Sequence, residues 1–95
     1  MKNGYIYIMT NKPKGTLYIG VTSDLAKRIY QYKNNILDGF TSAYNLKTLV
    51  YYEIFDDMQN AIFREKQLKN WHRGWKINLI ESINPNWNDL YRDII

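Results

Sequence analysis

Two short segments near the N-terminus concentrate side chains that could hold a phosphate or move a proton. Tyr5 and Tyr7 alternate with isoleucines in the first segment, and Tyr18 and Gly20 alternate with aliphatic residues in the second. Residues two apart in a strand share a face, so paired strands would gather three phenols on one face and aliphatic side chains on the other. Because the glycine leaves room beside these hydroxyls, this face is a candidate site.

Arg28 is a cation expected close to that face, because the second strand runs directly into the helix that carries it. A planar guanidinium can hold a phosphate by two parallel hydrogen bonds and offset negative charge as a bond breaks. A solvated helix arginine is the commoner fate of such a residue. The position beside the strand end favours the phosphate-binding role.

Glu65 is a carboxylate in an unusual place. Ala61, Glu65 and Leu68 fall at i, i+4 and i+7, so the carboxylate shares the apolar stripe of a helix. Burying an unpaired carboxylate is costly, so it needs a cation as a partner. Lys69, one turn further on, could form an ion pair, and a metal ion is the alternative. The residues alone leave these two interpretations evenly balanced.

A run of positive charge follows Glu65. Four cations are spaced three, four and three residues apart, at Lys66, Lys69, Arg73 and Lys76. They form one stripe if the helix is nearly continuous, although Gly74 could bend it. Most such runs are solvated helix faces; the functional alternative is contact with a nucleic-acid backbone, without sequence specificity. Trp71 and Trp75 are predicted to anchor the core between the last helices rather than to stack on bases.

Composition limits the class of protein. The 95 residues suit one domain, spanning 1–95, with a modest core. The absence of cysteine excludes a disulfide framework and a thiolate metal site. Neither a membrane-spanning apolar run nor a signal peptide is recognisable, so we expect a cytoplasmic protein without membrane contact. The net charge of +4 favours a polyanionic partner.

Turn residues and hydrophobic periodicity predict an α+β fold with the order ββαβαα. Strands are expected over about 4–9, 17–22 and 49–55, and helices over about 24–36, 57–71 and 73–83. Asp38 and Gly39 should end the first helix, and Asn84-Pro85 the last. The expected architecture is a small antiparallel three-stranded sheet flanked by helices.

This ordered set of residues resembles the GIY-YIG nuclease family. Tyr5-Ile6-Tyr7 is similar to the first half of the family signature, and Tyr18-Ile19-Gly20 to the second. The similarity continues through 24–28, 49–53 and 61–66. The closing stretch 84–90 resembles the small single-domain bacterial members whose substrate is unassigned, so the resemblance covers essentially the whole chain.

The resemblance implies a metal-dependent endonuclease that hydrolyses phosphodiester bonds. Tyr7 would receive or relay the proton of the attacking water, and Tyr18 would orient the phosphate or the water, although the sequence leaves these two roles interchangeable. Arg28 matches the catalytic arginine of the family. Glu65 matches its metal-binding glutamate, and a single carboxylate suits Mg²⁺ (or Mn²⁺), which keeps most of its water ligands.

Four positions are expected to support the site. Gly20 matches the glycine in the second half of the family signature, whereas the other three depart from the family pattern or fit it loosely. Tyr5 stands where the family name has glycine. Tyr32, one turn after Arg28, stands where many relatives carry a histidine, which puts more weight on Tyr7 as the proton acceptor. The family asparagine downstream of the glutamate would be Asn84, with Asn78 as the other choice.

The expected partner is nucleic acid, with DNA ahead of RNA, and the expected unit is a monomer. Without a recognition module, 95 residues imply structure-selective or weakly specific cleavage, or a protein partner that supplies specificity, in DNA repair or recombination. The alternative is a catalytically weak nucleic-acid-binding or interaction module that keeps the GIY-YIG fold. The joint presence of Tyr7, Tyr18, Arg28 and Glu65 favours the nuclease.

Overall fold

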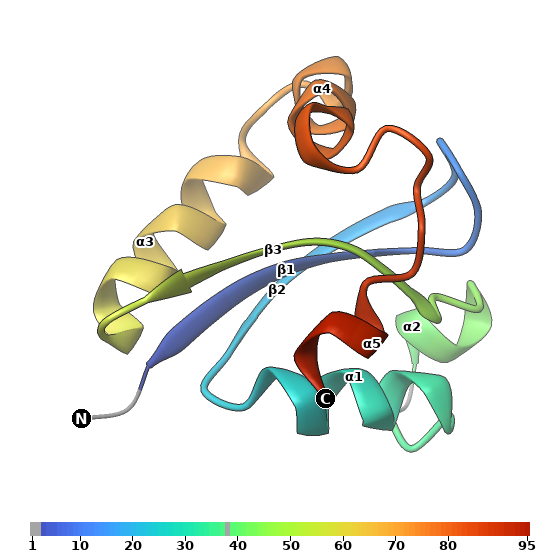
Figure 1. Cartoon of the computed structure of the whole chain (residues 1–95), viewed down its shortest axis with the longest axis horizontal. Helices are drawn as coiled ribbons and strands as arrows, with labels where there is room; N and C mark the ends of the chain where they lie inside the picture. Colours follow the sequence, from blue (N-terminus) through green and yellow to red (C-terminus); the bar gives the residue numbers. More distant parts are fainter. Residues whose placement is uncertain (1–2, 38) are drawn as a thin grey trace.

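The computed structural model describes residues 3–37 and 39–95. Its sheet consists of three antiparallel strands, β1 (Gly4–Thr10), β2 (Leu17–Thr22) and β3 (Thr48–Phe55). The strand order is β2-β1-β3, so the first strand of the chain is the central one. The helices are α1 (Leu25–Lys33), α2 (Phe40–Ala43), α3 (Met58–Lys69), α4 (Arg73–Ile83) and α5 (Tyr91–Ile94). Figure 1 shows α3 and α4 on one side of the sheet and α1 and α5 on the other, which confirms the α+β prediction.

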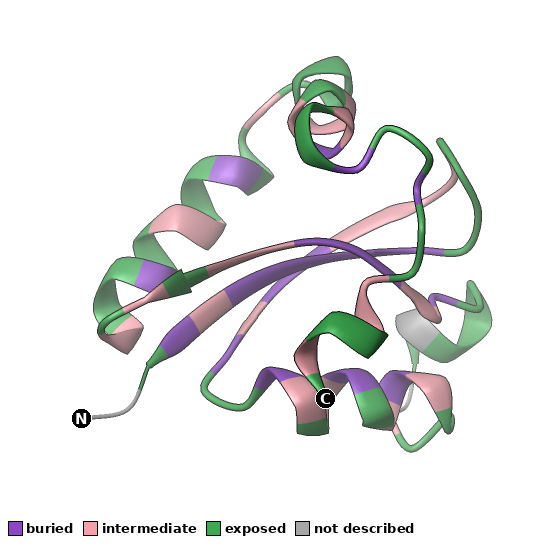
Figure 2. Cartoon of the chain, viewed as in Figure 1, coloured by how far each residue is buried: buried purple, intermediate pink, exposed green. Residues whose placement is uncertain are grey.

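The two faces of the sheet belong to two separate hydrophobic clusters. Ile6, Ile8 and Ile19 pack with residues of α3 on what we call the isoleucine face. Tyr7 and Met9 pack with residues of α1 on the opposite, tyrosine face. β1 is buried along most of its length (Figure 2) because both of its faces and both of its edges are covered. The predicted division of tyrosine and aliphatic side chains between the two faces is therefore confirmed.

Helix α1 is shorter than its apolar periodicity predicts. The Asp24 carboxylate caps its start by accepting a hydrogen bond from the Lys27 main-chain N–H. The helix ends at Lys33, and the left-handed backbone of Asn35 (φ 54°) turns the chain away. Ile36, at the end of the predicted helix, is consequently exposed and lies outside α1. Asp38, the other expected end signal, lies outside the described residues.

The prediction missed two four-residue helices, α2 and α5, and placed the end of α3 too far along the chain. The α3 helix ends at Lys69 rather than near Trp71, whereas the predicted bounds of α4 are confirmed. The break between the two helices therefore precedes Gly74. As a result, the four cations of the expected stripe lie on two separate helices.

The C-terminal segment, residues 84–94, runs along the outer edge of β3. The Leu90 N–H donates to the Leu49 carbonyl at 2.8 Å, and the Leu49 N–H donates to Asp89 Oδ1 at 3.2 Å. Lys33 of α1 forms an ion pair with Asp89 and donates to the Lys47 carbonyl at 3.0 Å. The segment thus satisfies main-chain groups that an edge strand would otherwise expose. In the part of the chain that the structure describes, no helix is long and apolar enough to cross a membrane.

Candidate active site

The hydroxyl of Tyr7 is the centre of a hydrogen-bonded group on the tyrosine face. It lies 2.7 Å from the Tyr32 hydroxyl, and Arg28 Nη1 donates to it at 3.2 Å. Arg28 and Tyr32 are one turn apart on α1, so both can reach the same strand residue. The Tyr32 ring also meets the rings of Tyr7 and Tyr18 edge-on, with centroids 5.7 and 6.3 Å apart. We call Tyr7, Tyr18, Arg28 and Tyr32 the tyrosine–arginine cluster.

Gly20 makes this arrangement sterically possible. It lies directly opposite Tyr7 in the register of β1 and β2. A Cβ atom at this position would be 2.2 Å from the Tyr7 hydroxyl oxygen and 2.4 Å from its ring carbon Cζ. The room predicted beside this glycine is therefore taken by the Tyr7 ring, which is only 1% exposed.

The surroundings raise the pKa of both hydrogen-bonded phenols. Burial raises the pKa of Tyr7, but the hydrogen bonds with Tyr32 and Arg28 and the charge of Arg28 oppose that rise. Burial also raises the pKa of Tyr32, and there the charge of Tyr7 and the shared hydrogen bond add to the increase. The pKa of each phenol is raised overall, and for Tyr7 two hydrogen bonds and the charge of Arg28 oppose the rise.

Burial lowers the pKa of Arg28, but its hydrogen bond to Tyr7 and the charges of the three phenols outweigh burial and raise that pKa overall. The guanidinium therefore stays charged. It also lines a polar pocket of about 210 Å³ together with residues of the β2–α1 connection and of α1, namely Thr22, Ser23, Asp24, Lys27 and Gln31. The sequence analysis missed Lys27 and Gln31. Gln31 follows Arg28 by three residues and Lys27 by four, and this helical spacing could have identified them.

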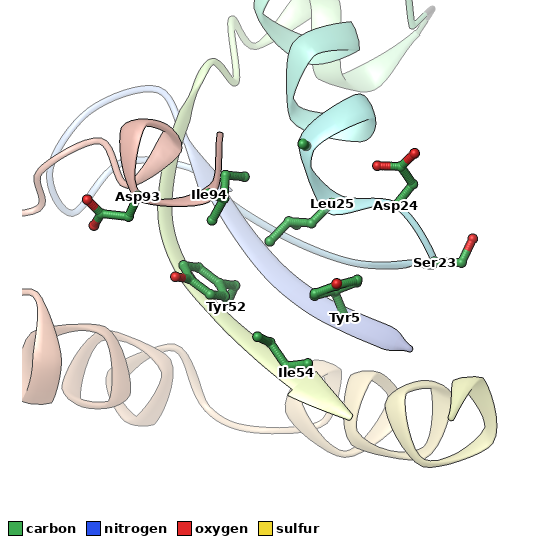
Figure 3. Close-up of a pocket in the computed structure, with 9 residues that line it drawn as sticks. Tyr5, Ser23, Asp24, Leu25, Tyr52, Ile54, Asp93 and Ile94 are labelled. Atoms are coloured by element: carbon green, nitrogen blue, oxygen red, sulfur yellow. The ribbon is translucent and has the colours of Figure 1, made fainter. Parts of the chain in front are cut away.

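Tyr5 lies on the tyrosine face but lines a different pocket, of about 290 Å³, between the ends of β1 and β3 and the helices α1 and α5. Figure 3 shows Tyr5 and Tyr52 side by side on the strands, with Asp24 on one side and Asp93 on the other. Ser23 and Asp24 line this pocket and the Arg28 pocket alike. Tyr5 therefore adjoins the Arg28 pocket through the start of α1.

Glu65 lies on α3, which packs against the isoleucine face. Its carboxylate is 15% exposed, and its Oε2 atom lies 3.2 Å from Lys69 Nζ, so the ion pair weighed from the sequence is formed. Over residues 3–37 and 39–95, no three side chains of His, Cys, Asp or Glu gather into a metal site. A metal here would have Glu65 as one protein ligand, which fits Mg²⁺ with its retained waters.

The side-chain amide of Asn84 forms three hydrogen bonds with main-chain groups. Its Nδ2 donates to the Val50 carbonyl at 3.0 Å and to the Asn88 carbonyl at 2.9 Å, and its Oδ1 accepts from the Asn88 N–H at 3.0 Å. The side chain is buried. The structure thus places this expected supporting residue where it fastens the C-terminal segment to β3.

Two of the four expected nucleic-acid-binding cations come together at the free edge of β2. A groove of about 280 Å³ runs there, lined by Leu17, Tyr18, Ile19, Lys69 and Lys76; we call it the β2 groove. Arg73 donates to the Gly15 carbonyl at 2.6 Å and to the Lys14 carbonyl, so it ties α4 to the turn between β1 and β2. Lys66 is exposed on α3.

The predicted core role of the two tryptophans holds for one of them. Trp71 packs against the core cluster of the isoleucine face. Trp75 is 55% exposed, so its expected place in the core was wrong. The early end of α3 explains the difference, because Trp71 and Trp75 do not lie on one helix.

Comparison with known proteins identifies the family. Residues 3–78 match the model of the GIY-YIG catalytic domain. A UPF0213 protein of Staphylococcus saprophyticus is 38% identical over 80 residues, covering 84% of this chain and 96% of that protein. A UPF0213 protein of Clostridium perfringens is 36% identical over 78 residues, covering 82% and 83%. The solution NMR structure of a UPF0213 protein from Bacillus halodurans, 24% identical, shares the fold over 92% of each chain with a TM-score of 0.57. The chain therefore belongs to the GIY-YIG catalytic domain family, among its small UPF0213 members.

Proposed function

We propose that this protein is a metal-dependent endonuclease that hydrolyses phosphodiester bonds, with DNA as its substrate. The observation that carries the proposal is the hydroxyl of Tyr7, which is held between the guanidinium of Arg28 and the hydroxyl of Tyr32. A buried phenol that shares hydrogen bonds with a cation and a second phenol is suited to moving a proton. Membership of a family defined by a catalytic domain supports the same conclusion.

Arg28 and Tyr7 have separate tasks in this proposal. Arg28 directs one N–H to Tyr7 and lines the polar pocket at the start of α1, so its other donors can hold the phosphate oxygens of a bound strand. The ionised form of Tyr7, stabilised by two hydrogen bonds, takes the proton of the water whose oxygen attacks phosphorus. Arg28 offsets the added negative charge as the ester bond breaks and the leaving oxygen takes up a proton from a solvent water. Tyr7 then releases its own proton to solvent. Tyr18 orients the phosphate or the water.

Glu65 is the residue that would hold the divalent cation. Its present partner, Lys69, is 51% exposed, so exchanging this ion pair for a metal ion costs little free energy. Lys69, the ion-pair partner of Glu65, lines the β2 groove together with Tyr18, and this shared contact supports a link between the carboxylate and the cluster. Bound there, Mg²⁺ or Mn²⁺ would supply charge stabilisation to the leaving oxygen.

The specificity and biological role that we propose follow from the size and charge of the chain. A single small domain with a net charge of +4 is suited to contacts with the phosphate backbone rather than with base edges. We therefore propose structure-selective or weakly specific cleavage in the cytoplasm by a monomer, in DNA repair or recombination, with a protein partner as one source of specificity.

The test is cleavage of end-labelled single-stranded, duplex, flap and junction DNA, and of RNA, with Mg²⁺ or Mn²⁺. Arg28→Ala and Glu65→Gln should each lower the cleavage rate by roughly 10²–10³-fold, because each removes charge stabilisation of the transition state. The exposed Arg92 and Asp56 provide matched controls, as Arg92→Ala and Asp56→Asn. Both controls should cleave at the wild-type rate.

A second function has its own support. The burial of Tyr7 and the ion pair of Glu65 with Lys69 would also suit a nucleic-acid-binding module with little turnover. If wild type and all four variants are equally inert while wild type still binds DNA in a salt-dependent manner, this function replaces the nuclease.

A further inference from the structure

The pocket in Figure 3 is lined by two phenol rings, those of Tyr5 on β1 and Tyr52 on β3; we call it the aromatic pocket. The two strands are neighbours in the sheet, and both rings are half-buried. The volume of about 290 Å³ is close to the lower end of the range for small-molecule sites, about 300–1,000 Å³. The aromatic pocket therefore suits a single flat ring system.

Three residues join the aromatic pocket to the tyrosine–arginine cluster. Tyr52 lies directly opposite Tyr7 in the register of β1 and β3, and residues paired in this way share a face of the sheet. Ser23 and Asp24 line both the aromatic pocket and the Arg28 pocket. The two pockets are therefore adjacent, and one ligand can reach both of them.

The two pockets differ in charge. Lys27 and Arg28 line the Arg28 pocket together with one carboxylate, that of Asp24. The aromatic pocket is lined by the carboxylates of Asp24 and Asp93 and by no lysine or arginine. A phosphate is thus attracted to the Arg28 pocket and repelled from the aromatic pocket. A ligand that fills both must combine an anionic group with an uncharged flat ring, and a nucleotide has these two parts.

We infer that the aromatic pocket holds an unpaired base next to the scissile phosphate, against the rings of Tyr5 and Tyr52, while Arg28 holds that phosphate. Tyrosine rings bind the bases of single strands in this way, because every base has a π-face. A base inside a duplex is paired and stacked on its neighbours, so it cannot enter the pocket. This inference rests on the proposed function and narrows its substrate to strands with an unpaired nucleotide at the cleavage point, such as single strands and flaps.

The experiment measures binding apart from cleavage, by NMR of the wild-type chain in EDTA. The probe is the dinucleotide dCpC, which has one phosphate with a base on either side. We expect it to shift the ring signals of Tyr5 and Tyr52 together with the guanidinium signal of Arg28, with a single dissociation constant. Inorganic phosphate should shift the signal of Arg28 alone. Deoxycytidine lacks the phosphate and should bind roughly 10-fold more weakly, as expected for the loss of a charge-assisted hydrogen bond.

Substitution of Tyr52 tests the contact with the base. Tyr52→Ala should weaken dinucleotide binding by roughly 10-fold, in line with the loss of one base–aromatic stack, and should leave the response to inorganic phosphate in place. Tyr52→Phe keeps the ring and should retain most of the affinity. The matched control is Tyr30→Ala, which removes an exposed tyrosine from α1 and should bind like wild type. The NMR spectrum of each variant shows whether it is folded, and the wild-type shifts test the inference without any variant.

Undetectable dinucleotide binding by wild type would overturn the inference. So would a shift of the Arg28 signal without those of Tyr5 and Tyr52, or an unchanged affinity in folded Tyr52→Ala. Larger shifts of the two ring signals with butylammonium ion than with the dinucleotide would also overturn it, because they would assign the aromatic pocket and its carboxylates to a cation.

Because EDTA removes any metal, this outcome is independent of cleavage. A chain that binds the dinucleotide through Tyr52 but never cuts DNA refutes the nuclease and keeps the inference. A chain that cuts DNA while Tyr52→Ala binds the dinucleotide like wild type refutes the inference alone.

Discussion

The acidity of Tyr7 depends on a few neighbouring atoms. Burial raises its pKa, and the hydrogen bonds that it shares with Tyr32 and Arg28 lower it. The hydroxyl of Tyr32 thus favours ionisation of Tyr7 although it need not touch a substrate, which makes Tyr32 a positioning residue. A histidine at this place would exchange protons near neutral pH, whereas the phenol of Tyr32 holds its proton.

Removal of that hydroxyl should move the pH dependence of cleavage. In Tyr32→Phe the pKa of Tyr7 loses one of the contacts that lower it, so a larger share of Tyr7 stays protonated at a given pH. The rising limb of the pH–rate profile should shift to higher pH, and the rate at neutral pH should fall by roughly 10-fold. The shift of the limb is the readout that merely weakened packing would not produce.

The control for this change is Tyr30→Phe, which alters an exposed tyrosine on the same helix and should leave the profile in place. A Tyr32→Phe profile that is lowered at every pH without a shift would mean that Tyr32 only supports the packing of α1.

At the scale of secondary-structure elements, the strands could be predicted because residue types alternate along them with a period of two, which assigns each side chain to one face of the sheet. In β1, two isoleucines lie on one face and two tyrosines on the other, and the structure shows the same division. The start of α1 was also readable, from the capping side chain of Asp24. Of the candidate site, the sequence placed Tyr7, Tyr18 and Arg28 together because the strands and α1 are adjacent in the chain.

The rest depends on interactions that no short segment contains. The α2 and α5 helices have four residues each, too few to show a helical period. Ile36 continued the apolar spacing, but Asn35 takes a left-handed backbone that ends the helix first. The exposure of Trp75 follows from the break between α3 and α4, which the helical spacing of the two tryptophans did not reveal.

The contact between β1 and β2 gives a prediction at the element scale. Gly20→Ala would place a methyl group 2.2 Å from the Tyr7 hydroxyl oxygen. The buried Tyr7 ring would have to shift and lose its hydrogen bonds to Arg28 and Tyr32, at a cost of about 1–3 kcal/mol in the free energy of unfolding. Urea unfolding measures the loss, and cleavage should fall with it.

Gly74→Ala is the matched change, because a Cβ at Gly74 on α4 meets no atom within 4 Å. This variant should gain about 0.5–1 kcal/mol of stability, as alanine suits a helix better than glycine. Equal stabilities of the two alanine variants would contradict the steric role of Gly20.

The attachment of α3 to β3 gives a second prediction at the scale of secondary-structure elements. Arg64 Nε and Nη2 donate to the two carboxylate oxygens of Glu53 at 2.9 and 3.0 Å, and Nη1 donates to Gln67 at 2.6 Å. Arg64→Lys keeps the charge but cannot reproduce the parallel pair, so we expect a loss of about 1–2 kcal/mol in the free energy of unfolding. Arg92→Lys, at an exposed site on α5, should change it by less than about 0.5 kcal/mol. Chemical denaturation of both variants decides; equal stabilities would mean that the charge alone matters.

At the scale of the whole molecule, buried tyrosines couple folding to pH. Burial raises the pKa of Tyr7, Tyr32 and Tyr51 above the ordinary value of about 10, and the hydrogen bond with Glu53 adds to the rise for Tyr51. The folded chain therefore keeps these protons at a pH where the unfolded chain has released them. Their contribution to stability is complete below about pH 10 and is lost as the pH rises further.

The melting temperature should consequently be flat up to about pH 9 and fall steeply above about pH 10. Tyr51→Phe should make that alkaline fall shallower, because one of the raised groups is gone, whereas Tyr30→Phe at an exposed position should not. Melting temperatures of the three chains from pH 7 to 11 test this, and parallel curves for all of them would show that Tyr51 does not contribute to the alkaline loss.

Because the first strand of the chain is the central strand of the sheet, it is synthesised well before one of its two partner strands. The hairpin of β1 and β2 and the helix α1 are synthesised before β3, so they can assemble the tyrosine–arginine cluster early. The growing chain then carries a central strand with one open edge until residues 48–55 emerge to pair with it. Open strand edges are the surfaces on which nascent chains aggregate. Synthesis through β3 is thus the interval in which this small domain most needs protection by chaperones.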